Sequence, residues 1–583
     1  MSALLDGNDL PQRWQGRERF VVLDTDFGTG ARFLSTLQMW RDDPRRCARL
    51  VFIALQPRVL VAADVHETLR PAWPPQTPDL HRLSFEAGQI ELLLAPGDAA
   101  PWMRELVAQV DAFCIDGNLP TDSLRLGKSL ARLAAPGATL AAENLPVTLR
   151  AQLTSAGFDV GVDLGETRAR FAPAFARRRP PSRGRTGGAV ERHALIVGAG
   201  LAGCAAAWAL AEQGWRSTLL ERRPQIAGEA SGNPAGLFHG IVNAQDGIHA
   251  RFNRAAALAA HGAVQAAVER GCAGSASGLL RLESTFDVAR MQAVLQQLGL
   301  PPAYVQALDA DDASERAGIA LAQPCWFYPG GGWVHPAGLA QTFLDRAGAS
   351  AKVRTGVDVR RLERSATGWR VLDARDQLLA EAPTLVLANA GDALRLLDAP
   401  DWPIDSVRGQ LSIARASQMP SARLPIAGSG YLLPAAGGAV MFGATAQSGD
   451  FDPAVRDADH ALNLAQLARL LGDATGLLPA DLEGRTAWRC SAADRLPVIG
   501  AVPDAAAQGA RLDQPRFVPR LPGLYVFTAL GSRGITWSAL GAQVLASCVT
   551  GAPAPIGASL LDAIDPARFV SRRVRAGRAP GRQ

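Results

Sequence analysis

Three glycines, Gly198, Gly200 and Gly203, form a G-x-G-x-x-G pattern whose spacing is suited to holding a dinucleotide. In such a loop the first glycine permits a tight turn, the second admits a pyrophosphate close to the backbone, and the third lets a helix pack on a strand. An apolar stretch precedes the glycines and an alanine-rich stretch follows them. A second apolar stretch ends at Glu221, where an acid can accept hydrogen bonds from ribose hydroxyls. The sequence therefore predicts a dinucleotide-binding strand–helix–strand unit.

Three later segments favour FAD over NAD as the dinucleotide. Residues 228–240, which include Ser231, form a small-residue loop suited to threading a long cofactor past the backbone. Residues 384–391 are typical of another buried strand that ends in small residues. Residues 523–542 predict a strand, a glycine turn and a helix start, although all three segments could be ordinary tight turns. The residues of this turn that we expect to lie near the flavin ring or phosphates are Gly531, Ser532, Arg533, Gly534, Ile535 and Thr536.

The amino-terminal half contains a second glycine loop, which could hold S-adenosylmethionine. Residues 20–34 predict a strand that ends at Asp24, a loop with Gly28 and Gly30, and a helix. Glycines in such a loop admit the methionine portion of the cofactor close to the backbone. The further stretches that read as strands are 50–57, 91–99, 110–120, 136–144 and 157–165. Strands separated by helices predict a doubly wound, Rossmann-like α/β sheet.

Two acids stand near the ends of consecutive predicted strands of this sheet. Asp98 follows the apolar part of 91–99, and Asp116 follows that of 110–120. Ligands of such sheets bind at the carboxyl ends of the strands. We expect Asp98 to hydrogen-bond the adenine amino group of S-adenosylmethionine, while Asp116 ends the next predicted strand.

The chain length and composition predict a multidomain globular protein. With 583 residues, two or three domains are expected. Apolar residues make up 48% and charged residues 20%, which excludes a disordered or fibrous chain. We predict a methyltransferase-like domain at 1–175, a basic linker at 176–193, an FAD-dependent domain with a substrate subdomain at 194–575, and a basic tail at 576–583.

The net charge of +5 is spread unevenly along the chain. The linker arginines, which have no acid among them, are Arg177, Arg178, Arg179, Arg183 and Arg185. The arginines that follow Asp565 are Arg568, Arg572, Arg573, Arg575, Arg578 and Arg582. Either these segments are a solvated linker and a frayed tail, or they bind a polyanion such as RNA with an affinity that falls with salt.

The cysteines and the apolar runs indicate the compartment. The seven cysteines are scattered and contain no C-x-x-C pair, so neither a disulfide framework nor a metal site is predicted. The uncharged run 194–211 is long enough for a membrane span, but its three glycines favour a buried strand followed by a buried helix. Residues 1–7 do not resemble a secretory signal. We expect a cytoplasmic protein without a membrane partner.

Five motifs occur together in the carboxy-terminal half. They are GNPAG (232–236), VRGQ (407–410), GATAQ (443–447), RCSAADRLPVIG (489–500) and LGSRGIT (530–536). With them, the chain from 194 to about 574 resembles the flavin domain of the tRNA 5-methylaminomethyl-2-thiouridine biosynthesis bifunctional family. It resembles glycine and D-amino-acid oxidases more distantly. The resemblance implies a two-domain FAD-binding oxidase fold.

The resemblance also implies a reaction on the wobble uridine of the tRNA anticodon loop, with no DNA partner. FAD takes a hydride from the carbon next to nitrogen in a carboxymethylaminomethyl arm, and the imine hydrolyses to glyoxylate and a primary amine. The methyltransferase half then methylates this amine with S-adenosylmethionine. Oxidation comes first because it unmasks the methyl acceptor, and one chain with both sites raises the effective concentration of the intermediate.

Such an arm ends in a carboxylate, which an arginine can bind with two parallel hydrogen bonds. By the resemblance, Arg489 holds this carboxylate and Tyr431 assists it, while Arg408 on the same inferred sheet is the second candidate. Arg489 could instead pair with a structural acid, and Tyr431 could be a core aromatic residue. His239 and His335 are possible general bases, but hydride abstraction from a neutral amine needs no strong base.

The amino-terminal half resembles the methyltransferase half of the same family, with departures. The resemblance implies that Asp116 orients the amine. Gln56 stands where the family has an acid that grips the ribose hydroxyls, and Asp26 replaces the first glycine of the loop. Residues 118–123 depart from the family's aromatic, Lys-Asn-Pro and Trp, and its first strands before Asp6 are missing. We hypothesise that this half keeps the fold and some cofactor affinity but has weakened or lost methyl transfer.

Three functional interpretations remain open at the level of sequence. The first is a bifunctional tRNA-modifying enzyme whose two sites act in order. The second is a small-amine oxidase of the glycine oxidase type with a vestigial amino-terminal half. In the third, an active oxidase carries a silent methyltransferase half that docks RNA. The basic segments disfavour the second interpretation, because a free amino acid needs no polyanion-binding surface.

Overall fold

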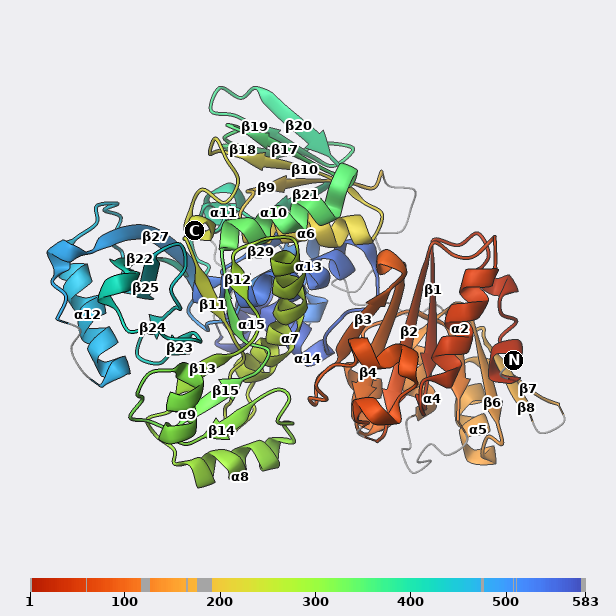
Figure 1. The fold of residues 1–583 in the computed structure, drawn as a ribbon. Coiled ribbons are helices and arrows are strands. Elements are labelled where there is room, and N and C mark those ends of the chain that lie inside the picture. Colours follow the sequence, from red (N-terminus) through yellow and green to blue (C-terminus); the bar gives the residue numbers. More distant parts are fainter. Residues whose placement is uncertain are drawn as a thin grey trace. The chain divides into compact units, whose positions relative to one another are not determined.

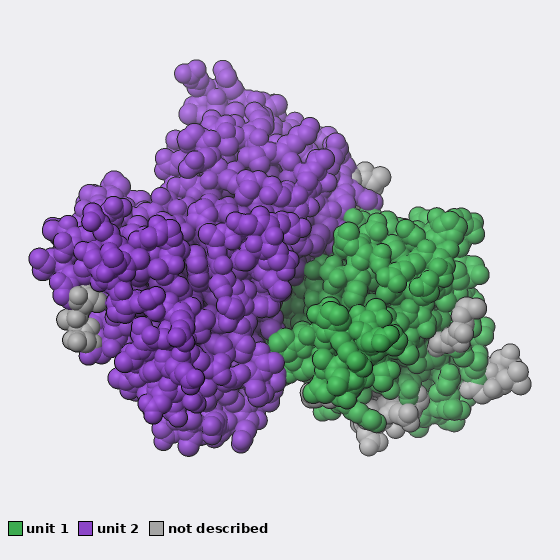
Figure 2. Space-filling view, in the orientation of Figure 1, with its two compact units in different colours: residues 1–184, 551–561 green, residues 185–550, 562–583 purple. Residues whose placement is uncertain are grey.

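The computed structural model describes residues 3–58, 60–116, 126–163, 166–175, 191–472, 476–506, 508–509 and 511–577. The chain forms two compact units, coloured separately in Figure 2. The first contains residues 1–184 and 551–561, and the second contains residues 185–550 and 562–583. Most of the predicted basic linker, 176–190, lies outside the described residues.

The first unit is built on an eight-stranded sheet with the order β3-β4-β2-β1-β5-β6-β8-β7 (Figure 1). Its strands are β1 (Arg19–Asp24), β2 (Arg49–Gln56), β3 (His81–Phe85), β4 (Ile90–Pro96), β5 (Val110–Ile115), β6 (Ala134–Glu143), β7 (Phe158–Asp163) and β8 (Glu166–Phe171). The five central strands, from β4 to β6, are parallel, and β3, β8 and β7 add antiparallel edges. This confirms the predicted Rossmann-like sheet, although the sequence did not indicate β3 and β8.

Helices cover both faces of this sheet because the apolar residues of its strands alternate between two clusters. Leu23 and Ile53 lie in one cluster, with residues of α3 (Ala99–Glu105), α4 (Leu126–Leu133) and α5 (Val147–Ser155). Val22 and Phe52 lie in the other cluster, with residues of α2 (Ala31–Asp42). Strands buried on both faces are expected of a parallel sheet.

A segment from near the end of the chain completes the first unit. The backbone N–H of Ala554 donates to the Val107 carbonyl at 2.9 Å. Ser559, in α14 (Ala558–Ile564), donates from both its N–H and its hydroxyl to Glu105, each at 2.8 Å. The sequence placed residues 551–561 in the second domain, whereas the structure places them in the first unit.

The second unit contains a six-stranded sheet with the order β17-β10-β9-β21-β29-β28. Its strands are β9 (His193–Val197), β10 (Arg216–Glu221), β17 (Ala351–Thr355), β21 (Thr384–Leu387), β28 (Val498–Pro503) and β29 (Arg520–Thr528). Helix α6 (Leu201–Glu212) is buried and packs against α10 (Pro336–Ala347) and α13 (Gly534–Thr550) (Figure 1). The uncharged run 194–211 is thus a buried strand and helix, as predicted. No described helix is long and apolar enough to cross a bilayer.

A second, nine-stranded sheet forms the substrate subdomain, with the order β14-β15-β13-β23-β24-β25-β22-β26 and β27 paired to β22. Its strands are β13 (Leu279–Leu282), β14 (Gln306–Leu308), β15 (Cys325–Tyr328), β22 (Ile404–Arg415), β23 (Ile426–Ala427), β24 (Tyr431–Leu432), β25 (Ala439–Gly443), β26 (Gln447–Ser448) and β27 (Glu483–Ala492). Helix α12 (Asp457–Leu471) packs on β22 and β25. A three-stranded sheet of β18 (Arg361–Arg364), β19 (Trp369–Leu372) and β20 (Leu378–Ala382) extends the dinucleotide-binding part (Figure 1).

Candidate active site

A cavity of about 510 Å³ lies in the second unit, where the six-stranded sheet meets the substrate sheet. The glycine loop after β9, residues 227–239 and the turn 531–536 all contribute to its lining. The substrate sheet contributes one row of directly paired residues, which are Arg281, Ala427, Tyr431, Gly443, Leu411 and Arg485. Because paired residues of neighbouring strands share a face, this row forms one wall of the cavity.

The three glycines after β9 sit where side chains would not fit. Gly198 has a φ of +98°, and a Cβ there would lie 2.7 Å from the Ala388 carbonyl oxygen. A Cβ on Gly203 would collide with the Gly198 carbonyl oxygen, and one on Gly200 would lie 3.0 Å from the Ser231 hydroxyl. The N-terminal end of α6, which attracts phosphate, faces this cradle. These residues fit the pyrophosphate of a dinucleotide.

Glu221 and Ser231 are held in fixed orientations beside the cradle. The Glu221 carboxylate accepts hydrogen bonds from the backbone N–H groups of Ala199 at 2.8 Å and Arg223 at 2.9 Å. The Ser231 hydroxyl accepts from the Leu201 N–H at 3.1 Å. A carboxylate oxygen has two acceptor positions, so Glu221 can still accept from ribose hydroxyls. Both residues line the cavity.

The turn between β29 and α13 also borders the cavity. All six predicted residues, from Gly531 to Thr536, line it. Helix α13 begins at Gly534, and the first N–H groups of a helix have no partner within the helix. These donors, at the positive end of the helix dipole, could stabilise negative charge on a bound flavin or phosphate.

Arg489 and Tyr431, the two residues predicted to bind the carboxylate, come together in the cavity wall. The Arg489 guanidinium donates to the Thr445 carbonyl, and no acid pairs with it among the described residues. Burial lowers the pKa of Arg489, and the nearby Tyr431 opposes that shift. Burial raises the pKa of Tyr431 to about 12, so its phenol remains a hydrogen-bond donor at neutral pH. Gly409 makes room for this arginine, since a Cβ there would lie 2.5 Å from its Nη2. The pair can bind a carboxylate.

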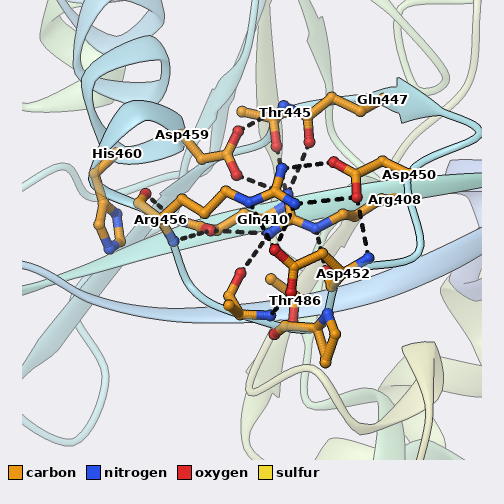
Figure 3. Close-up of polar contacts among 12 residues, drawn as sticks. Arg408, Gln410, Thr445, Gln447, Asp450, Asp452, Arg456, Asp459, His460 and Thr486 are labelled. Atoms are coloured by element: carbon orange, nitrogen blue, oxygen red, sulfur yellow. Dashed lines mark hydrogen bonds and ion pairs between the residues drawn. The ribbon is translucent and has the colours of Figure 1, made fainter.

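Arg408 does not belong to the cavity, which corrects its place as the second carboxylate-binding candidate. Its side chain is fully buried and forms an ion pair with Asp459 at 2.6 Å (Figure 3). It also donates to the Gln447 side chain at 2.7 Å and to the Asp452 carbonyl at 2.7 Å. These partners leave the guanidinium no freedom to bind substrate. Arg408 therefore fixes α12 and the loop after β26 to the substrate sheet.

The two histidines occupy different surroundings. His335 caps helix α10, since its Nδ1 accepts from the Gly338 N–H at 3.2 Å. His239 lies fully buried in the cavity wall. Burial, together with the charges of Arg533 and Arg281, holds the pKa of His239 well below its usual range. His239 is therefore neutral at physiological pH.

In the first unit, β1 and β5 bring two predicted site acids close together. Asp24 is fully buried at the end of β1 and forms an ion pair with Arg32. Burial raises the pKa of Asp24 to about 6, although Arg32 opposes this shift. Asp116 follows β5, its N–H donates to the Thr25 hydroxyl at 2.9 Å, and its charge also acts on Arg32. Exposed Asp98 follows β4 at the same edge of the sheet.

Two buried acceptor atoms support the fit of this edge to S-adenosylmethionine. Asp24 Oδ2 and Gln56 Oε1 are buried without a hydrogen-bond partner. They stand at the carboxyl ends of β1 and β2, where ligands of such sheets bind. Gln56 can accept from a ribose hydroxyl, although without the charge of an acid. Gly28 and Gly30, with φ of +55° and +93°, form the predicted loop between β1 and α2.

The arginines that follow Asp565 are only partly available to a polyanion. Arg568 is fully buried in α15 (Arg568–Arg575) and pairs with Asp494 at 2.8 Å. Arg572 shares that acid at 2.6 Å, and Arg573 pairs with Asp401. These ion pairs count against the alternative in which all the arginines after Asp565 bind a polyanion. Arg578, Arg582 and the five linker arginines lie outside the described residues.

Sequence reasoning missed three arginines of the cavity, Arg222, Arg281 and Arg485. Arg485 binds the loop before β11 (Gly236–Phe238), donating to the Glu229 carbonyl at 3.0 Å and to Asn233 at 3.2 Å. A period of two along β27 places Arg485 on the same face as Arg489, which is the signal that could have found it. Nothing local to the sequence singles out Arg281.

The chain is similar to known families along most of its length. Residues 193–548 match a family described as FAD dependent oxidoreductase, and residues 61–172 match one described as S-adenosyl-L-methionine-dependent methyltransferase. Among solved structures, glycine oxidase from Geobacillus kaustophilus covers 64% of this chain and 97% of its own, at 23% identity and a TM-score of 0.50. L-proline dehydrogenase from P. horikoshii covers 66% and 98%, at 15% identity and a TM-score of 0.51. These likenesses confirm the oxidase fold.

Two curated relatives are both tRNA 5-methylaminomethyl-2-thiouridine biosynthesis bifunctional proteins (MnmC). The protein of Methylibium petroleiphilum is 47% identical over 98% of this chain and 93% of its own length. The protein of Burkholderia multivorans is 40% identical over 98% and 92%. The chain therefore belongs to this bifunctional family, with an FAD-dependent oxidoreductase domain and an S-adenosylmethionine-dependent methyltransferase domain.

Proposed function

We propose that this protein modifies the wobble uridine of tRNA in two steps. Its second unit removes the carboxymethyl group from a 5-carboxymethylaminomethyl arm by oxidation, and its first unit methylates the amine that is released. The observation that carries the oxidative step is the pair of Arg489 and Tyr431 in the same cavity as the dinucleotide cradle. Arg489 and Tyr431 together are called the carboxylate clamp. A cavity that combines this clamp with the glycine cradle for FAD suits a glycine-like amine.

FAD, when bound, supplies the hydride acceptor for this oxidation. The chain's own contribution is to bind and orient the arm. Arg489 and Tyr431 hold the carboxylate, which fixes the adjacent carbon in the cavity next to the cofactor. Neutral His239 imposes no positive charge on the amine, which must be unprotonated to lose a hydride. The N–H groups at the start of α13 stabilise negative charge.

S-adenosylmethionine, when bound, supplies the methyl group for the second step. The residues that would hold it are Asp24, Gln56 and Asp98, at the carboxyl ends of β1, β2 and β4. We propose that Asp116 accepts a hydrogen bond from the substrate amine and orients its lone pair. Gln56 predicts weaker binding of the ribose than an acid would give, because a neutral amide is a weaker acceptor than a carboxylate.

The test is mass spectrometry of wobble nucleosides after incubation of carboxymethylaminomethyl-tRNA with the purified flavoprotein. Without S-adenosylmethionine we expect a mass loss that matches the primary amine, and with it a further methyl gain. Loss without gain would favour an active oxidase with a silent methyltransferase half, which the departure at Gln56 makes the second candidate. No change, with FAD still bound, would contradict the proposal and favour a small-amine oxidase.

A further inference from the structure

Two arginines of the active-site cavity have no acidic partner within the described part of the chain. Arg281 comes from β13 and Arg533 from the turn before α13, and both side chains line the cavity. Among the described residues, neither guanidinium forms an ion pair or a hydrogen bond. The two positive charges also act on each other: burial lowers the pKa of Arg533 to about 10, and the Arg281 charge adds to that shift. Two half-buried like charges that line one cavity indicate a site for an anion.

The acids of the cavity cannot neutralise these arginines, because each is already engaged at the dinucleotide end. Glu221 accepts from two backbone N–H groups, as described above. Glu229 pairs with Arg222 and Arg223. Asp358 pairs with Arg360 at 2.7 Å, and Asp392 pairs with Arg395 at 2.8 Å. These four are the acids among the lining residues.

The register of the substrate sheet places Arg281 relative to the carboxylate clamp. Arg281 is paired with Ala427, and Ala427 is paired with Tyr431. The three residues therefore share one face, and the backbones of Arg281 and Tyr431 lie about 10 Å apart at the usual strand spacing. If the C5 arm of a nucleotide reaches Tyr431, the sugar and phosphate of that nucleotide lie at a similar distance from Tyr431. Arg281 is thus on the same wall as the clamp, one nucleotide away.

The chemistry of the substrate identifies the anion, on the basis of the proposed function. Arg489 and Tyr431 account for the carboxylate of the arm, and the glycine cradle with the α6 N terminus accounts for the pyrophosphate of FAD. The uracil ring is neutral, so the remaining anions of the substrate are its phosphodiesters. We propose that Arg281 and Arg533 form a phosphate subsite that binds the RNA backbone next to the wobble base.

This phosphate subsite would select RNA over free amino acids within the active site itself. An arginine fork binds phosphate with charge-assisted, paired hydrogen bonds. A free amine with a glycine-like arm would fill only the clamp of Arg489 and Tyr431. Affinity for the polynucleotide would then depend on salt through Arg281, because each phosphate contact releases counterions.

The test compares two substrates that carry the same arm, the carboxymethylaminomethyl-tRNA and the free carboxymethylaminomethyl nucleoside. For Arg281→Gln we expect the KM for tRNA to rise about tenfold. The slope of log KM against log salt should fall by about 0.7, the share of one phosphate contact on a single strand. Oxidation of the nucleoside should keep its kcat/KM within about twofold of the wild-type value.

Two further variants separate this subsite from general charge and folding effects. Arg281→Lys keeps the charge, so it should restore most of the salt slope. Arg361→Gln is the matched control, because Arg361 is an exposed arginine of β18 that already pairs with Asp376. This control removes one positive charge outside the cavity and should leave both substrates unaffected. Flavin content reports whether each variant folds.

Several outcomes would overturn the subsite. An unchanged salt slope in Arg281→Gln would contradict the proposal, and so would an equal loss of kcat/KM with tRNA and with the nucleoside. A shifted flavin reduction potential with unchanged tRNA kinetics would mean that the two arginines serve the reduced flavin instead. If the wild-type protein oxidises the nucleoside but not the tRNA, the proposed function fails, and that result is distinguishable from failure of the subsite alone.

Discussion

Arg489 combines three properties that suit a substrate-binding residue. Its guanidinium is desolvated, it lacks an acidic partner among the described residues, and it donates to a backbone carbonyl that fixes its orientation. A structural arginine of this chain looks different, since Arg408 pairs with a buried acid and with backbone carbonyls. The contrast between the two side chains indicates that Arg489 is free to bind a ligand and that Arg408 is structural.

Arg489→Lys should raise the KM for the carboxymethylamino arm by about 10- to 100-fold, equivalent to about 1.5–3 kcal/mol for hydrogen bonds to a charged group. Lysine keeps the charge but cannot offer the planar pair of donors. Steady-state kinetics with the free nucleoside measures the effect. Tyr431→Phe should cost less, since it removes one neutral donor. Unchanged KM in both variants, with full flavin content, would contradict the clamp.

The pKa of Tyr431 predicts a flat pH profile for carboxylate binding. Burial raises this pKa to about 12, so the phenol stays protonated and can donate while pH rises through the usual tyrosine range near 10. Binding is lost only as pH approaches the raised pKa, because the ionised phenolate would repel a carboxylate. Titration with glycolate, followed by flavin absorbance, should give a constant Kd between about pH 7 and 10. A Kd that weakens across this range in wild type but not in Tyr431→Phe would contradict this.

At the scale of elements, a buried polar network ties α12 to the substrate sheet behind the clamp (Figure 3). Gln447 bridges Arg408 and Asp459, donating to the latter at 2.8 Å. The side-chain amide of Gln410 accepts from the Arg456 N–H at 2.8 Å and donates to the Arg456 carbonyl at 2.9 Å. The backbone of Gln410 also pairs with Thr445, whose carbonyl receives Arg489. The network thus supports the clamp from the opposite face of the sheet.

Asp459→Ala should destabilise the second unit by about 3–5 kcal/mol, because it leaves the buried Arg408 charge without a partner. Replacing both residues, as in Arg408→Met with Asp459→Leu, should cost less, since no buried charge remains. Denaturant unfolding followed by flavin release compares the variants. If the double variant is as unstable as Asp459→Ala, packing rather than charge pairing explains the cost.

At the scale of the whole molecule, the first unit is assembled from both ends of the chain. Residues 1–184 carry its sheet, and residues 551–561 add the hydrogen bonds to Val107 and Glu105. Residues 185–550 of the second unit therefore lie between the two segments of the first unit, and residues 562–583 belong to the second unit again. A single cut in the linker would therefore leave residues 551–561 of the first unit covalently attached to the second unit.

Residues 1–184 alone should be less stable than the same residues joined by a flexible linker to 551–561. The lost hydrogen bonds, from Ala554 and twice from Ser559, are worth about 1–3 kcal/mol in total. Urea unfolding measures the difference, and a fusion to a scrambled 551–561 segment is the control. Equal midpoints for the three proteins would show that this segment does not stabilise the unit.

The sequence by itself determined the local parts of this protein. Gly198 to Glu221 and the turn 531–536 could be identified because strand, turn and helix follow one another within a few tens of residues. The same holds for β1, the loop with Gly28 and Gly30, and α2. These features depend on backbone conformations that only glycine adopts easily and on apolar stretches of fixed spacing. Arg489 and Tyr431 were found through the family resemblance.

Only the tertiary structure decided which arginines line the cavity. Arg489 is paired with Val407 on the neighbouring strand. Arg408 is the next residue after Val407, so its side chain points to the opposite face of the sheet. A shift of one residue along a strand reverses the face of its side chain, and the register comes from distant pairings. The same register brings Arg281 into line with Tyr431 across two strands. The return of 551–561 to the first unit likewise depends on contacts between residues far apart in sequence, which no local pattern encodes.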